Sequence, residues 1–118
     1  MKLPGLAHKR VLVVEDDYLV AMDIARALER AGAEVIGPAS AVEAALAALE
    51  QTVLDGAILD INLGGEMAFP VADALMARGI PFIFATGYDA QVIPLRFTHV
   101  KRCEKPTTPE AISRALFG

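Results

Sequence analysis

Hydrophobic and polar residues follow two different patterns along this chain. Short, continuous apolar runs are typical of parallel strands covered on both faces. Such runs occupy residues 11–14, 57–59 and 82–85. Elsewhere apolar residues return every three or four positions, as they do on the buried side of a helix. These stretches span residues 20–31, 42–49, 70–78 and 109–116. The alternation of the two patterns predicts an α/β fold.

Local signals indicate where several of these helices begin and end. Gly32 follows the first helical stretch and is the usual C-terminal stop. Ser40 stands three residues before Glu43, the spacing of a capping box, and predicts the start of the second helix. Pro70 is expected at the first position of the third helix, and Thr108 is expected to cap the last one, just before Pro109.

Three further elements carry weaker patterns. Residues 34–37 predict a short strand, residues 89–97 a short helix, and residues 98–103 an irregular edge strand with few apolar positions. Five strands and five helices in alternation predict a doubly wound, five-stranded parallel sheet of order 2-1-3-4-5. With 118 residues, the chain is expected to be a single domain, residues 1–118, in which residues 1–9 form an N-terminal tail.

Composition excludes several classes of function. The formal net charge of −4 argues against direct nucleic-acid binding, which needs a basic patch. The chain has no apolar run near the roughly 20 residues of a membrane span and no secretory signal, so we expect a cytoplasmic protein without membrane contact. Cys103 is the only cysteine and cannot form an internal disulfide. His8 and His99 have no second ligand at metal-binding spacing and are expected to be solvated or structural.

The predicted strand ends carry the candidate chemistry, because ligands of such sheets bind outside the carboxyl ends of the strands. Carboxylates gathered there repel one another and need a cation or raised pKa values. Without a cluster of His or Cys, their hard oxygens favour Mg²⁺ or Mn²⁺. The residues at these ends are Glu15, Asp16, Asp17, Asp60, Thr86 and Lys105.

The same residues have the means to accept a phosphoryl group. Asp16, Asp60 and the backbone carbonyl of Asn62 are the expected metal ligands. A carboxylate can attack phosphorus when a metal and a fixed cation, here Lys105, neutralise the charge on the transferred group. The Thr86 hydroxyl can then donate a hydrogen bond to the new phosphoryl oxygen. Asp17 has another expected role, as the N-cap of the first helix.

The strings "VLVVEDD", "AILDINL", "FATG" and "EKP" together resemble the response regulator receiver domain of two-component signalling. The extended string "FATGY" is similar to the receiver subgroup called FATGUY. This resemblance implies that Asp60 accepts phosphate from a histidine kinase or a histidine phosphotransfer protein. It implies Asp16 as direct metal ligand, Glu15 as a ligand through water, and Thr86 with Lys105 as the switch pair.

Two positions depart from the receiver pattern. Arg102 stands three residues before Lys105, where many receivers carry an aromatic residue that turns inward on activation. Gly64 replaces a proline often found four residues after the acceptor, and with Gly65 it predicts a more mobile loop. Tyr88 fits two interpretations equally, a partner-facing aromatic or a half-buried edge residue.

We therefore expect a stand-alone receiver, not a classical enzyme, whose phosphorylation biases a surface formed by residues 89–97, 98–103 and 109–116. The signal would leave by contact with a protein partner, by onward transfer of phosphate, or by draining a shared kinase. One alternative is a phosphate-independent binding module of the same fold. A less favoured one is a phosphohydrolase of the haloacid dehalogenase type, which generally has a second aspartate where this chain has Asn62. A flavin site is disfavoured because carboxylates replace the phosphate-binding loop after the first strand.

Overall fold

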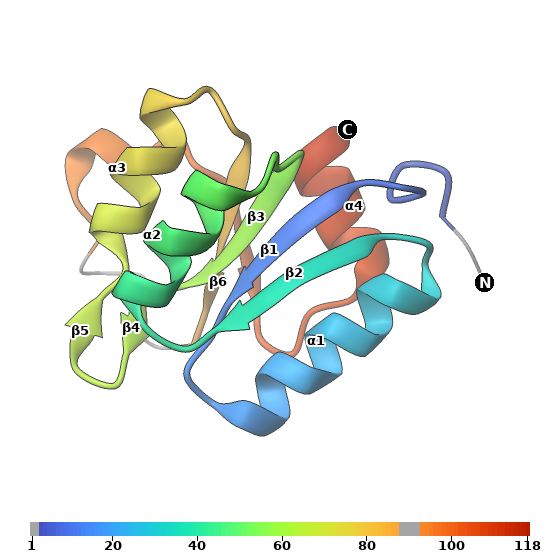
Figure 1. Cartoon of the computed structure of the whole chain (residues 1–118), viewed down its shortest axis with the longest axis horizontal. Helices are drawn as coiled ribbons and strands as arrows, with labels where there is room; N and C mark the ends of the chain where they lie inside the picture. The colour runs from blue at the N-terminus through green and yellow to red at the C-terminus, as the bar shows by residue number, and fades with distance from the viewer. Residues whose placement is uncertain (1–2, 88–92) are drawn as a thin grey trace.

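The centre of the protein is a five-stranded parallel sheet (Figure 1). In the computed structural model, residues 3–87 and 93–118 are described, apart from the side chain of Thr86. The strand order is β2-β1-β3-β6-β7, and every neighbouring pair is parallel. Counted along the chain within this sheet, the order is the predicted 2-1-3-4-5. The strands are β1 (Arg10–Val14), β2 (Glu34–Ala39), β3 (Gly56–Asp60), β6 (Phe82–Thr86) and β7 (Arg102–Glu104).

Helices cover both faces of this sheet, which confirms the predicted doubly wound α/β fold. The helices are α1 (Tyr18–Arg30), α2 (Val42–Gln51), α3 (Phe69–Ala77) and α4 (Pro109–Phe117). Figure 1 shows α2 and α3 on one face and α1 and α4 on the other. None of the helices within the described residues combines the length and apolar character that a transmembrane span requires.

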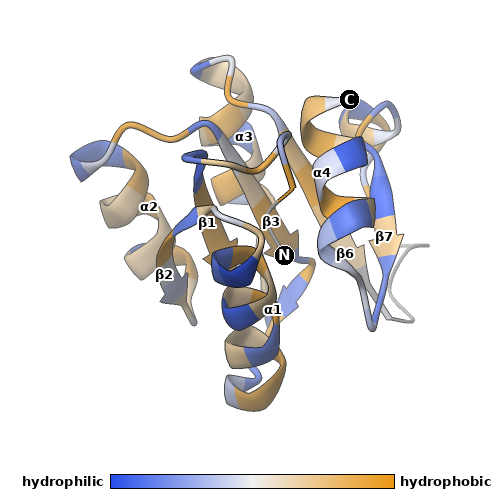
Figure 2. Cartoon of the chain, turned by 90° about the vertical axis from the view of Figure 1, so that its right-hand side faces the viewer, coloured by the Kyte–Doolittle hydropathy of each residue, from blue (hydrophilic) through white to orange (hydrophobic). Residues whose placement is uncertain are grey.

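The core lies in two layers, one on each side of the sheet. Leu12 and Val14 face the layer under α2 and α3, whereas Val11 and Val13 face the layer under α1 and α4. Because successive residues of a strand point to opposite faces, a strand covered on both sides must be apolar at every position. Figure 2 shows this contrast: β1 and β3 are largely orange, and the edge strand β7 is mostly blue.

Three of the predicted helix ends are confirmed. The Asp17 carboxylate accepts hydrogen bonds from the amides of Leu19 and Val20 at the start of α1. Gly32, at φ +103°, follows the end of α1. The Thr108 hydroxyl accepts from the Ala111 amide, 3.1 Å away, at the start of α4. Such caps depend on neighbouring residues alone, and the local sequence was sufficient to identify them.

The capping box predicted at Ser40 is wrong. Helix α2 begins at Val42, and its N-cap is Ala41, which makes no side-chain hydrogen bond to the helix. Strand β2 continues to Ala39, which pairs with Val14 of β1, so the chain stays extended two residues beyond the predicted strand end. The third helix also differs slightly, since it begins at Phe69 and Pro70 takes its second position.

The weaker elements differ more from the prediction. In place of the helix expected at residues 89–97, the described part has a short 3₁₀ helix, η2 (Leu95–Phe97), and residues 88–92, including Tyr88, lie outside it. The edge strand predicted at residues 98–103 begins later and is shorter, since β7 covers Arg102–Glu104. The segment expected to be an N-terminal tail packs against the domain. Its Leu6 side chain is fully buried in the layer under α1 and α4.

The loop after Asp60, expected to be mobile, forms a β-hairpin instead. Strand β4 (Asn62–Leu63) pairs antiparallel with β5 (Glu66–Met67). The two turn residues, Gly64 at φ +65° and Gly65 at φ +100°, adopt the left-handed conformations that a two-residue hairpin requires. The glycine pair therefore makes a defined turn beside the strand end.

Candidate phosphoacceptor site

Three carboxylates meet at the carboxyl end of the sheet. Strand β1 leads into Glu15 and Asp16, and its neighbour β3 ends at Asp60. One oxygen of each carboxylate lies within 4.8 Å of the others. Glu15 is buried, Asp60 is partly buried, and Asp16 is exposed. The parallel pairing of β1 with β3 therefore brings residues more than forty positions apart in the sequence into one cluster.

Lys105 supplies the positive charge within this cluster. Its ammonium nitrogen Nζ lies 2.6 Å from Glu15 Oε1 and 3.2 Å from Asp60 Oδ1. The lysine follows the edge strand β7 directly, so its side chain reaches the end of β3 across the end of β6. At this distance the ammonium and the buried Glu15 Oε1 form an ion pair.

Burial controls the protonation of Glu15. Loss of hydration raises the pKa of Glu15 from its ordinary 4.5 to about 7, against the opposing effects of Lys105 and of the Asp17 amide. Burial alone would lower the pKa of Lys105, but its contacts with Glu15 and Asp60 together raise it. The cluster is thus short of positive charge, since one ammonium serves two carboxylates and Asp16 stands beside them.

The donor set fits a hard divalent cation. All three clustered side chains offer carboxylate oxygens, the ligands that Mg²⁺ and Mn²⁺ prefer. Asn62 uses its side-chain oxygen to accept from the Gly65 amide, 2.7 Å away, within the hairpin turn. The backbone carbonyl of Asn62 as a metal ligand stays a prediction.

The hairpin is the part of the site that the sequence analysis missed. A Cβ built on Gly64 would lie 3.6 Å from Asp16 Oδ2, so the turn lies directly against the exposed member of the cluster. The signal was present, because two glycines between short polar and apolar pairs are typical of a two-residue hairpin. The turn forms one wall of the candidate metal site.

Two predicted residues are only partly placed. Thr86 ends β6, where it pairs with Glu104 of β7, and its side chain lies outside the described part of the structure. Its hydroxyl contact with a phosphoryl group stays a prediction. Arg102 is exposed on β7 beside Phe84. Three aromatic rings pack against Phe84, those of Phe69, Phe82 and Phe97, with centroids 5.7 to 6.2 Å from its own.

The chain is similar in sequence to known signalling proteins. A family model described as the response regulator receiver domain matches residues 11–116. The sensory transduction protein LytT of Bacillus subtilis is 35% identical over 91% of this chain. The chain spans about a third to a half of the length of the curated relatives it matches, 34% in one LytT and 46% in another.

Solved structures extend the likeness to the fold. SdrG from Sphingomonas melonis Fr1 is 41% identical and superposes with a TM-score of 0.80, covering 97% of this chain and 96% of SdrG. The form of SdrG described as BeF3-activated gives a TM-score of 0.66. PhyR from Bartonella quintana, described as an anti-anti-sigma factor, is 28% identical with a TM-score of 0.77, covering 93% of this chain and 48% of PhyR. With the family model, the fold and the acidic cluster in agreement, this chain belongs to the response regulator receiver domain family.

Proposed function

We propose that Asp60 accepts a phosphoryl group from a histidine kinase or a histidine phosphotransfer protein. The observation that supports this most directly is the position of Lys105, whose ammonium lies 3.2 Å from Asp60 Oδ1 at the edge of an acidic cluster. A carboxylate that only capped a turn would need neither the buried Glu15 nor a shared lysine. The arrangement provides a nucleophile, a fixed cation and candidate metal ligands in one place.

In the transfer, a carboxylate oxygen of Asp60 forms the new O–P bond while the N–P bond of the donor phosphohistidine breaks. The bonding electrons return to the imidazole nitrogen, which takes a proton from solvent. Lys105 stays beside the carboxylate and balances the added negative charge. Asp16, Asp60 and the Asn62 carbonyl would hold Mg²⁺ or Mn²⁺, with Glu15 acting through water, and the ion would supply further charge neutralisation.

The output of the domain is a change of protein partner. Thr86 and Lys105 would turn toward the phosphoryl group and alter the surface that includes η2, β7 and α4. PhyR of Bartonella quintana is described as an anti-anti-sigma factor, which supports a protein as partner.

We further propose that this receiver domain acts in the cytoplasm and belongs to the FATGUY-type subgroup. Its only chemistry would be its own phosphorylation and dephosphorylation. Onward transfer of phosphate and drainage of a shared kinase are consistent with the same site. In both of these roles, phosphorylation would leave the affinity of the domain for a downstream partner protein unchanged, whereas partner switching requires that affinity to change.

Intact-mass measurement after incubation with acetyl phosphate tests the proposal. The wild-type chain should gain one phosphoryl group in the presence of Mg²⁺ and none with EDTA. Asp60→Asn should gain none, and the control Asp23→Asn, an exposed aspartate of α1, should behave as wild type. Absence of any adduct together with absence of Mg²⁺ binding would favour the phosphate-independent module. Sustained release of many equivalents of phosphate would favour a phosphohydrolase.

A further inference from the structure

The side chain of Asn62 folds over the turn of the β4–β5 hairpin. Its oxygen Oδ1 accepts a hydrogen bond of 2.7 Å from the amide of Gly65, one of the two turn residues. Asparagine side chains commonly bond to nearby backbone amides in this way at turns. Figure 1 shows the hairpin at the lower left, where it projects beyond the end of the sheet. The hydrogen bond therefore ties the projecting turn back to the first residue of the hairpin.

The base of the hairpin is fixed by the core, whereas its turn is not. Leu63 is buried in the layer under α2 and α3. The amide of Ala68 donates to the carbonyl of Ile61, 2.8 Å away, and closes the base. By contrast, a Cβ built on Gly65 would meet no heavy atom within 4 Å apart from its chain neighbours. Packing does not hold this part of the turn, so its position depends on the bond to Asn62.

The turn held in this way borders the acidic cluster. A Cβ built on Gly64 would lie 3.6 Å from Asp16 Oδ2. Asn62 itself stands two residues after Asp60, and its backbone carbonyl is one of the proposed metal ligands. The residue that carries this carbonyl is held from two sides, by its pairing with Met67 and by its own side chain. The hydrogen bond thus acts on the backbone at the edge of the candidate metal site.

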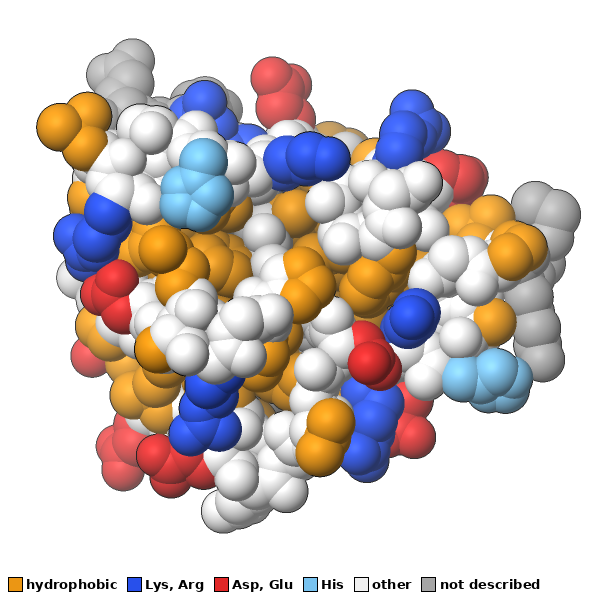
Figure 3. Space-filling view, turned by 90° about the horizontal axis from the view of Figure 1, so that it is seen from above, with side chains coloured by type: hydrophobic (Ala, Val, Ile, Leu, Met, Phe, Trp, Pro, Cys, Tyr) orange, Lys and Arg blue, Asp and Glu red, His pale blue; other side chains and the backbone are white. Residues whose placement is uncertain are grey.

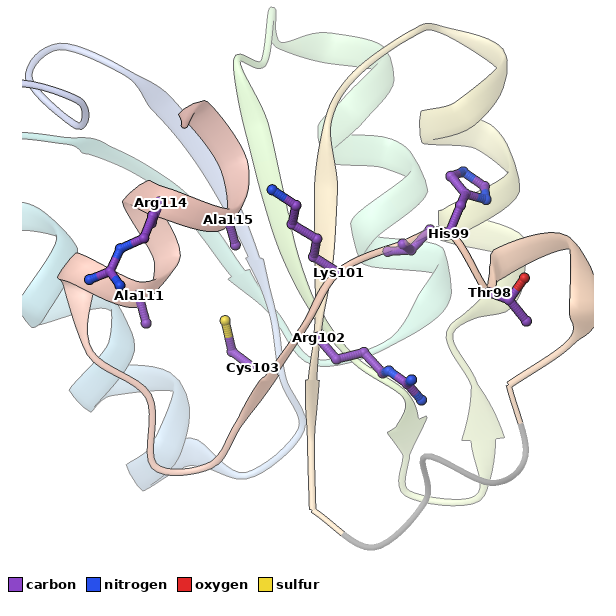
Figure 4. A pocket seen from close by; sticks show the side chains of 9 residues that line it. Thr98, His99, Lys101, Arg102, Cys103, Ala111, Arg114 and Ala115 are labelled. Carbon is purple, nitrogen blue, oxygen red and sulfur yellow. The ribbon is translucent and has the colours of Figure 1, made fainter.

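This hydrogen bond lies apart from the other surface features of the molecule. The pocket shown in Figure 4 is lined by residues 98–103 and by side chains of α4, and the hairpin contributes none of its lining among the described residues. A change at Asn62 therefore leaves the side chains of that surface in place. An effect of such a change on cation binding can be assigned to the hairpin.

We propose that the side chain of Asn62 is a positioning residue for the divalent cation. By holding the turn, it orients its own backbone carbonyl toward the ion and keeps Gly64 against Asp16. Hydrogen bonds that orient the ligands of a metal commonly change its affinity by about 10- to 100-fold. The inference rests on the proposed function, because it concerns the same Mg²⁺ or Mn²⁺ site. It assigns the side chain of Asn62 a role of its own, distinct from that of the carbonyl.

The Mg²⁺ affinities of three variants, measured by isothermal titration calorimetry, test this role. Asn62→Ala removes the acceptor and should weaken binding about tenfold. Asn62→Ser keeps a shorter acceptor of the kind found in similar turns and should recover part of the loss. The control Gln51→Ala removes an exposed amide at the end of α2 and should bind as wild type does. Gln51 precedes the start of β3, at the amino ends of the strands, the face that Figure 3 views.

Two further measurements separate positioning from a loss of stability. In EDTA, the Gly65 amide should exchange its hydrogen faster in Asn62→Ala than in wild type, while urea denaturation should give similar free energies of unfolding, since the bond is exposed. With Mn²⁺ bound, the amides of residues 15–16 should be broadened equally in the two proteins. The amides of residues 62–63 should be broadened less in the alanine variant, because the carbonyl of residue 62 no longer faces the ion.

Unchanged Mg²⁺ affinity in Asn62→Ala, with a wild-type chain that binds the ion, would overturn this inference and leave the proposed function intact. Equal weakening in Asn62→Ala and Gln51→Ala would also overturn it, as would an affinity loss that follows a loss of folding stability. A wild-type chain that binds no divalent cation would overturn the inference together with the metal site of the proposed function. Phosphorylation of Asp60 would then be judged separately, by the intact-mass measurement.

Discussion

The Lys105 ammonium lies 2.6 Å from Glu15 Oε1 and so connects the segment after β7 to the end of β1. The same nitrogen lies 3.2 Å from Asp60 Oδ1. One cation therefore serves both the candidate acceptor and a buried carboxylate that has no direct part in the transfer. Any group that adds or removes charge at Asp60 changes the balance between these two contacts. The predictions below follow from this sharing and from the packing around it.

Replacement of Lys105 by Met should destabilise the protein, and more at high pH than at low pH. At pH 8 Glu15 is ionised, and loss of the ammonium leaves its buried carboxylate uncompensated, at a cost of about 1–3 kcal/mol. At pH 5 Glu15 is protonated, since its pKa is about 7, and the cost should be smaller. Urea denaturation at the two pH values measures this difference. Lys101→Met removes an exposed lysine instead and should change stability by less than about 0.5 kcal/mol. Equal losses at both pH values would contradict the prediction.

Glu15 should make the metal-free protein less stable as the pH rises. Its pKa is raised from 4.5 to about 7, so between these values the folded state keeps a proton that the unfolded state has released. The free energy of unfolding therefore falls through this window, by up to about 3 kcal/mol at 1.36 kcal/mol per pKa unit. The difference between wild type and Glu15→Gln, measured by urea denaturation in EDTA, isolates this effect. Saturating Mg²⁺ should reduce it, because a cation favours the ionised form. Parallel pH profiles of the two proteins in EDTA would refute it.

Divalent-cation affinity should depend on the clustered carboxylates and not on acidity in general. Asp16→Asn and Asp60→Asn should each weaken Mg²⁺ binding about tenfold or more, equivalent to at least about 1.4 kcal/mol. Asp23→Asn removes one charge outside the cluster and should bind as wild type does. Isothermal titration gives the affinities, and line broadening by Mn²⁺ should be strongest for the amides of residues 15–16 and 60–62. Similar weakening in all three variants would mean diffuse electrostatic attraction rather than a site.

Phe97 should anchor η2 to the core. Its side chain is fully buried, and its ring centroid lies 5.7 Å from that of Phe69 and 5.8 Å from that of Phe84. Phe97→Ala should lower the free energy of unfolding by about 3–5 kcal/mol, the usual cost of a large cavity. Leu95→Ala, in the same short helix but at a side chain that is 88% exposed, should cost less than about 0.5 kcal/mol. Chemical denaturation of both variants decides the point, and comparable costs would show that η2 is not anchored through this ring.

Gly64 should reject the proline that many receivers carry at this position. Its φ of +65° is opposite in sign to the value near −65° that the proline ring imposes. Gly64→Pro should therefore cost more than about 1 kcal/mol and disturb the hairpin beside Asp16. Gly64→Asn should cost less, because asparagine tolerates the left-handed conformation. Thermal denaturation compares the two variants, and a proline variant as stable as wild type would mean that the hairpin turn is not required.

Much of the fold could be predicted because its signals are local. The continuous apolar runs of β1 and β3 report burial on both faces, and the caps at Asp17, Gly32 and Thr108 involve residues within a few positions of each other. The prediction of a helix cap at Ser40 was wrong because of a contact between residues far apart in the sequence. Pairing of β2 with β1 keeps the chain extended through Ala39, and this moves the helix start.

At the candidate site, too, local features could be predicted and long-range contacts could not. The sequence by itself determined which residue types stand at the strand ends, because the alternation of apolar runs and polar ends shows where each strand stops. Only the tertiary structure decided that Lys105 contacts Glu15 as well as Asp60, that Glu15 is buried enough to raise its pKa, and that a hairpin lies against Asp16. These relations depend on strand order and register between segments far apart in the chain. Patterns within a short stretch of sequence do not contain these distances, whereas pairing of the strands fixes them.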